Sequence, residues 1–168
     1  MDDLFRILVQ FLHVFTGVLW IGGGLYTLFV QTPSLMAAPP QARGPVLGQL
    51  IPRQVTYLLR LGEVTIATGI LNLFASGRGR ELENVLGSRW AVAIVIGALL
   101  AIVLLGLGHA VIKPSAMRLL QVGARVAAGD AAAPAEAQAI IARLRTVGYA
   151  QIVLGLVIVL AMVTARFS

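Results

Sequence analysis

The distribution of apolar and polar residues along the chain predicts four membrane-spanning helices. The apolar runs cover residues 4–30, 55–75, 90–112 and 147–165. Each run is long enough for a helix to cross the hydrocarbon core of a bilayer, which takes about 20 residues. The second run is the least apolar because it contains Arg60 and Glu63, but its length and its leucine and isoleucine content still favour a span.

The segments between these runs differ in composition. Residues 31–54 contain five of the seven prolines, which predicts an irregular or short-helical loop. Residues 76–89 are short and charged. Residues 113–146 have helical periodicity on both sides of a Gly-Asp-Ala-Ala-Ala-Pro turn, which predicts a helical hairpin beyond the membrane. We expect one transmembrane domain over residues 1–168, an all-α antiparallel four-helix bundle with this hairpin between its third and fourth spans and no convincing internal repeat.

The composition is typical of a membrane protein. Hydrophobic residues make up 58% of the chain and charged residues 12%, about half the charged fraction of soluble domains. The net charge is +6, with arginines scattered between the apolar runs, which suits lipid headgroups and argues against a nucleic-acid surface. The lack of cysteine excludes disulfides and thiolate metal sites. No small-residue cleavage site follows the first run, so we do not expect a removable signal peptide.

The basic residues predict an orientation in the membrane. One group lies at the two ends of the chain and in the second connection, and comprises Arg6, Arg78, Arg80, Arg89 and Arg166. The other group lies in the first and third connections, and comprises Arg43, Arg53, Lys113, Arg118, Arg125, Arg143 and Arg145. Cytoplasmic loops carry the excess of basic residues. We therefore expect a multi-pass protein of a bacterial-type inner membrane with both termini outside the cytoplasm.

The first span carries a stripe of polar, aromatic and glycine residues. The stripe consists of His13, Thr16, Gly17, Trp20, Gly24 and Thr27. This spacing places the stripe on one face of a helix, and the opposite face is Leu, Val and Phe. Because ionisable residues in a span usually point away from lipid, we expect the stripe to face the bundle interior. An intramembrane histidine can serve either as a ligand or as a hydrogen-bond partner between helices, and the residues alone leave both interpretations open.

The second and third spans add further polar residues. Arg60 and Glu63 lie three apart on one side of a helix, which predicts either an internal ion pair or partners for a proton or a cofactor carboxylate. Asn72 is interpreted as a packing hydrogen bond. His109 precedes Lys113-Pro114 near the end of the third span, where it is either an interfacial histidine or a second ligand.

The depths of the two histidines limit the kind of site they can form. His13 lies nine residues into its span and His109 nineteen residues into a parallel one. At a rise of ~1.5 Å per residue, their depths differ by ~15 Å if the spans start level. Two separate sites, or one site with a histidine on one side only, therefore compete with a single site between both. Glu63, on the antiparallel second span, is expected within a few Å of His13 in depth.

The motifs of the first and third spans resemble those of the copper-resistance D family of four-helix membrane domains. The residues that carry the resemblance are His13, Trp20-Ile21-Gly22-Gly23 and Pro33, then His109, Lys113-Pro114 and Arg118-Leu119-Leu120. The first motif is also similar to relatives of this group, the J-type protoporphyrinogen oxidase and the membrane domain of a bacterial urate oxidase. J-type oxidases usually continue into a Tyr-Leu-Pro-Arg motif, and Leu25-Tyr26-Thr27-Leu28 in its place argues against that enzyme.

The resemblance implies metal chemistry at the two histidines, because members of this group handle copper or bind b-type haem. Copper(I) prefers Met and Cys sulfur, and this chain has no Cys and only scattered Met. Haem needs one or two His, a slot of small and aromatic residues, and Arg for its propionates. The expected cofactor-binding residues are His13, Thr16, Gly17, Trp20, Gly24, Arg60 and Glu63, and the expected metal ligands are His13 and His109.

We therefore expect an integral membrane protein that binds haem b and serves electron transfer or other redox chemistry. A copper transport or tolerance protein is the alternative, and a cofactor-free structural subunit of a larger membrane complex is a third. The expected partners are the lipid bilayer, a redox partner or larger membrane complex, and a second copy of the chain. No catalytic motif identifies an enzyme or a substrate.

Overall fold

The structure is a computed structural model that describes residues 3–168, and the regular elements in that range are all helical. In chain order they are α1 (Asp3–Tyr26), η1 (Thr27–Gln31), α2 (Thr32–Ala37), α3 (Pro40–Ala75), η2 (Gly79–Gly87), α4 (Arg89–Leu107), η3 (Gly108–Ile112), α5 (Lys113–Ala127) and α6 (Ala133–Arg166). The elements η1 and η3 are π-helical turns, and η2 is a 3-10 helix. The all-α prediction is therefore confirmed.

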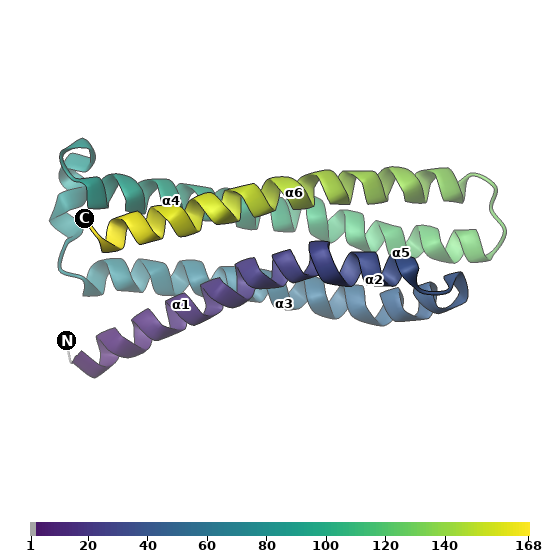
Figure 1. The fold of residues 1–168 in the computed structure, drawn as a ribbon, viewed down its shortest axis with the longest axis horizontal. Helices are drawn as coiled ribbons and strands as arrows, with labels where there is room; N and C mark the ends of the chain where they lie inside the picture. Colours follow the sequence, from purple (N-terminus) through teal and green to yellow (C-terminus); the bar gives the residue numbers. More distant parts are fainter. Residues whose placement is uncertain (1–2) are drawn as a thin grey trace.

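The helices form two antiparallel hairpins that lie side by side in one bundle (Figure 1). In one hairpin α1 packs mainly against α3, and in the other α4 packs mainly against α6. Four helices are long and apolar enough to cross a membrane. They cover Asp3–Ala37, Gln41–Ala75, Arg89–Ala127 and Ala133–Arg166. The prediction of a multi-pass antiparallel four-helix bundle is thus confirmed.

Apolar side chains cover the outer faces of these helices. Phe11, Val18, Leu99 and Leu160 are each more than half exposed in the isolated chain. The main cluster of buried residues instead lies at one end of the bundle and consists of Trp90, Ala91, Ala93 and Ala165. A monomer in water rarely exposes apolar surface so widely. These outer faces therefore fit the hydrocarbon core of a bilayer.

The segment 31–54 is helical except at residues 38–39: the short helix α2 agrees with the short-helical part of the prediction, but residues 40–54 belong to the long helix α3 and not to a loop. Its residues form the end of η1, then α2 and the first turns of the 36-residue helix α3. Pro45 and Pro52 lie inside α3. Proline removes one backbone donor, but its fixed φ is compatible with a helix. Arg43 Nε donates to the Ala38 carbonyl at 2.9 Å and braces the short break between α2 and α3.

The hairpin formed by α5 and the first half of α6 confirms the predicted helical extension. Gly129 turns the chain with a φ of +84°, a conformation that favours glycine. Arg125 pairs with Asp130 at 2.7 Å and with Glu136 at 2.6 Å across the turn. Hydrogen bonds from Arg125, and then from the Ala132 backbone N–H, hold the pKa of Asp130 below its ordinary value. The charged side chains thus fix the turn.

Both hairpins contain a π-helical turn that the sequence analysis did not predict. The N–H of Thr32 bonds to the Thr27 carbonyl, and the N–H of Lys113 bonds to the Gly108 carbonyl. Each bond spans five residues and is followed at once by a proline, Pro33 or Pro114. A π-helical turn adds one residue to the helix and is frequent at functional sites. Both hairpins therefore carry the same widened turn before a proline, although the chain shows no convincing sequence repeat.

Candidate functional site

The stripe of α1 faces α3, level by level. A Cβ atom added at Gly69 would lie 2.9 Å from His13 Cε1, and one added at Gly62 would lie 2.7 Å from Trp20 Cε2. The numbers of the facing residues sum to 82 at both levels, as expected for two antiparallel helices in constant register. The inward orientation predicted for the stripe is therefore observed at His13 and Trp20, and α3 is the helix that covers them.

His13 is held in a defined orientation by α3. Its Nδ1 lies 2.8 Å from the Thr65 carbonyl oxygen. A carbonyl oxygen can only accept, so Nδ1 carries the proton. In the neutral imidazole the lone pair then belongs to Nε2. This is the ring arrangement of a metal-ligating histidine, whose second nitrogen donates to a protein acceptor.

Next to His13, threonine hydroxyl groups extend the polar contact between α1 and α3. Thr65 Oγ1 donates to Thr16 Oγ1 at 2.9 Å, and Thr16 Oγ1 donates to the Leu12 carbonyl at 2.8 Å. Thr68 Oγ1 donates to the Val64 carbonyl at 2.6 Å. We call His13, Thr16, Thr65 and Thr68 the His13 cluster. Thr16, Thr65 and Thr68 are buried and His13 is half-buried, so the cluster is a polar patch within the α1–α3 interface.

The remaining stripe residues differ in their surroundings. Trp20 is half-buried and lies on the bare backbone of Gly62. A Cβ at Gly17 would make an ordinary contact of 3.5 Å with Thr65 Cγ2, and one at Gly24 would meet nothing within 4 Å. Gly62 therefore makes room for Trp20 within the bundle, whereas Gly24 borders open space.

A second group of polar residues, the His109 cluster, joins α3 to η3. Arg60 Nη1 donates to Glu63 Oε2 at 2.7 Å, and His109 Nε2 lies 3.2 Å from Glu63 Oε1. We define this cluster as Arg60, Glu63 and His109. Their side chains are 75%, 35% and 42% exposed, respectively. The predicted pairing of Arg60 with Glu63 is confirmed, but the expected interior location is wrong for Arg60, which lies on the outer face.

The two clusters lie at different depths. His13 is level with Gly69, whereas Gly108, next to His109, packs on Leu59 of the same helix α3. Those two α3 positions are ten residues apart, or ~15 Å along the helix axis. At the backbone level of Gly108 this is the depth difference expected from sequence, but the His109 side chain itself reaches Glu63, six residues from Gly69.

Glu63 belongs to the His109 cluster and not to the His13 level where the sequence analysis placed it. It lies six residues from Gly69 along α3, or ~9 Å, and its carboxylate is bonded to His109 and Arg60. In the observed register the numbers of facing residues sum to 82, so the α3 residue level with His13 is Gly69 and not a residue nearer Glu63.

A third polar contact was missed because Gln54 fell within the predicted loop. Gln54 exchanges side-chain hydrogen bonds of 2.7 and 2.9 Å with Gln31, and it donates to Thr27 Oγ1 at 2.6 Å. Gln151 of α6 donates to the Leu104 carbonyl at 3.2 Å, one turn before η3. The signal available in the sequence was the presence of the uncharged polar residues Gln31, Gln54 and Gln151 at or near the ends of the predicted apolar runs.

Asn72 does not make the packing hydrogen bond that the sequence analysis assigned to it. Its Nδ2 is buried without a hydrogen-bond partner among the described residues. Within residues 3–168 there is also no group of three or more His, Cys, Asp or Glu side chains placed to hold a metal ion.

Comparison with known proteins adds no relative: no protein-family model, curated protein or solved structure matches the chain. The resemblance to the copper-resistance D family thus rests on the short motifs around His13 and His109.

Proposed function

We propose that this chain is an integral membrane protein that binds one b-type haem, with Nε2 of His13 as an axial ligand, and that it serves electron transfer. The bond from His13 Nδ1 to the Thr65 carbonyl is the observation that carries this proposal. It fixes the tautomer and the ring orientation, which are two requirements of a histidine ligand. A bound haem would supply one-electron redox chemistry, while the chain supplies the ligand, its orientation and the exclusion of water.

The donors present fit haem better than bare copper. A porphyrin gives its iron four nitrogen ligands, so the protein adds only one or two. A protein copper site needs several protein donors, with sulfur preferred for copper(I). The chain has no Cys, and Met162 packs on Gly97 in the other hairpin. The copper alternative therefore finds no support in the donor set.

His109 is not suited to be the second ligand of the same iron. Two ligands of one iron lie only two metal–nitrogen bonds apart, whereas His13 is level with Gly69 and His109 bonds Glu63, and these α3 positions are ~9 Å apart along the axis. The haem at His13 therefore has one histidine ligand from this chain. In the His109 cluster, Arg60 bonds Glu63 through Nη1 and exposes most of its side chain. It retains donors for a carboxylate such as a haem propionate.

The test is the optical spectrum of the protein purified from cells supplied with haem. His13→Ala should remove most of the Soret absorbance, because no Cys and no neighbouring Met can replace the ligand. His109→Ala is the control, because it removes the other histidine of the chain from a separate cluster, and it should retain the haem. The proposal fails if the wild type carries no haem, or if both variants keep the wild-type spectrum.

A further inference from the structure

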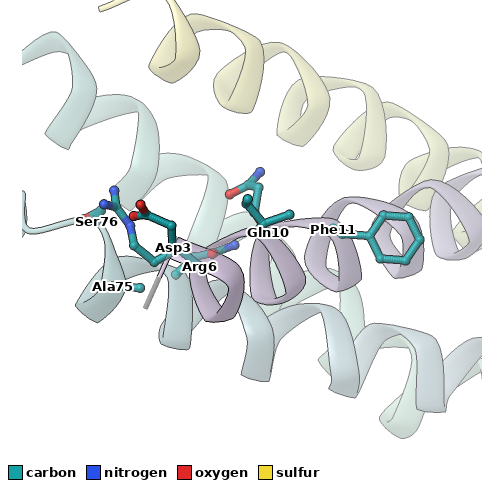
Figure 2. Close-up of a pocket in the computed structure, with 8 residues that line it drawn as sticks. Asp3, Arg6, Gln10, Phe11, Ala75 and Ser76 are labelled. Atoms are coloured by element: carbon teal, nitrogen blue, oxygen red, sulfur yellow. The ribbon is translucent and has the colours of Figure 1, made fainter. Parts of the chain in front are cut away.

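A cleft of about 700 Å³ lies between the first turns of α1 and the last turn of α3 (Figure 2). Its lining residues are Asp3, Arg6, Ile7, Gln10, Phe11, Asn72, Ala75 and Ser76. It lies at the end of the bundle where α1 begins and α3 ends, apart from both clusters described above (Figure 1). Nothing in the proposed haem site uses these residues.

This end of the bundle corresponds to a membrane surface. The helices α3 and α4 meet there through the charged segment that holds Arg78 and Arg80, α4 begins at Arg89, and α6 ends at Arg166. Arginines at the ends of spans mark the level of the lipid headgroups. The mouth of the cleft, at Arg6, is therefore at headgroup level.

The α1 wall of the cleft changes from charged to apolar with depth. Asp3 and Arg6 lie at its outer end, Gln10 follows one turn deeper, and Phe11 extends along the helix away from the charged pair (Figure 2). Arg6 and Phe11 are five residues apart, or ~7.5 Å along the axis. A phospholipid has the same order of groups, with a charged headgroup above ester groups and acyl chains. A small soluble anion would leave the apolar part of the wall unused.

The polar groups of the cleft match a zwitterion. Asp3 and Arg6 carry opposite charges on one wall, and within residues 3–168 no ion pair joins them to each other or to another side chain. Asn72 on the opposite wall has an amide nitrogen without an acceptor. A buried donor without a partner is unfavourable, so the amide gains from a ligand that offers oxygen acceptors.

We infer that this cleft binds the headgroup of a phospholipid that carries a primary ammonium, of the phosphatidylethanolamine type. Arg6 receives the phosphate, Asp3 receives the ammonium, and the Asn72 amide, after rotation, donates to a phosphate or ester oxygen. Ile7 and Phe11 lie along the upper part of an acyl chain. The inference is independent of the haem at His13.

Native mass spectrometry of the detergent-solubilised protein tests the site. The protein is incubated with equal amounts of phosphatidylethanolamine, phosphatidylcholine and phosphatidylglycerol of identical acyl chains. Phosphatidylethanolamine should be retained preferentially, because the methylated ammonium of phosphatidylcholine cannot donate to Asp3 and phosphatidylglycerol has no cation. Arg6→Gln should weaken its retention about tenfold, the loss expected for one charge-assisted hydrogen bond.

Two further variants make the assignment specific. Asp3→Asn should remove the preference for phosphatidylethanolamine over phosphatidylcholine while leaving total lipid retention similar. Arg166→Gln, an arginine at the same membrane surface outside the cleft, should retain lipid like the wild type. Equal retention of the three lipids, or the same loss in Arg166→Gln as in Arg6→Gln, would overturn the proposal. Competition by water-soluble glycerophosphoethanolamine at equal concentration would overturn it too, since the site would then read a soluble phosphoester and not a lipid.

Discussion

Substituting Gly69 with alanine tests whether the orientation of His13 depends on its contact with α3. The added methyl group would lie 2.9 Å from His13 Cε1 and 3.2 Å from Nδ1. The first distance is shorter than side chains tolerate, and the imidazole is not free to move away because Nδ1 is bonded to the Thr65 carbonyl at 2.8 Å. Gly69→Ala should therefore push the ring aside and break or lengthen that bond.

The expected size follows from two terms. Overpacking a well-packed site costs about 1–3 kcal/mol, and loss of an interhelical hydrogen bond in a membrane protein costs about 0.6 kcal/mol on average. Replacing glycine with alanine inside a helix contributes roughly 1 kcal/mol in the opposite direction. The net loss of stability should lie between about 0.5 and 2.5 kcal/mol.

A matched variant isolates the contact from helix propensity. Gly22→Ala introduces the same methyl group into a helix, where it would meet nothing within 4 Å. It should be neutral or slightly stabilising, so the difference between the variants measures the His13 contact alone. Thermal unfolding in detergent gives the stability, and the Soret band of haem-loaded protein gives the ligation. Equal melting temperatures and equal spectra for the two variants would refute both the packing and its link to the ligand.

Two other substitutions test the polar groups away from His13. Glu63→Gln should loosen both Arg60 and His109 and so lower the melting temperature in detergent. Identical melting curves for Glu63→Gln and wild type would contradict the contact. Hydrogen bonds from Arg78 and then from Ser88 hold the pKa of Glu81 below its ordinary value. The ionised carboxylate therefore stabilises the fold fully at pH values above its ordinary pKa. This stabilisation is lost as the pH falls through the lowered pKa. Glu81→Gln should flatten that acidic part of the curve of melting temperature against pH.

The fold was predictable because apolar length and turn composition act locally. Runs of about 20 apolar residues have few alternatives in a bilayer, and all four predicted runs lie within the observed long helices. The prediction for residues 31–54 was partly wrong, because it treated the prolines there as helix breakers. Pro45 and Pro52 instead lie inside α3, since the φ of proline is helical and only its missing donor and its ring oppose the helix.

The site was predictable only in part, because helix register and local turn geometry decide it. The 3.6-residue period placed His13 and Trp20 on one face, and that face meets α3. The period says nothing about which glycine of the neighbouring helix lies opposite, so Gly62 and Gly69 were not identified. It also assumes a regular helix, and so could not anticipate the π turn that contains His109. The contact between His109 and Glu63 therefore came only from the structure.

The proposed haem and the proposed lipid both bind the N-terminal half of α1, which has few neighbours in the bundle. The contacts of α1 with α6 are made where Ile21 meets Gly155, and one element later where Leu28 of η1 meets Gly148. Nearer its N-terminus α1 diverges from α6, and α3 is the helix that α1 contacts most (Figure 1). The half that contains Arg6 and His13 is thus supported mainly by one neighbour. A ligand that binds only the folded state stabilises that state by mass action. A haem at His13 and a lipid at Arg6 would therefore each add support where the helix bundle itself gives α1 the least.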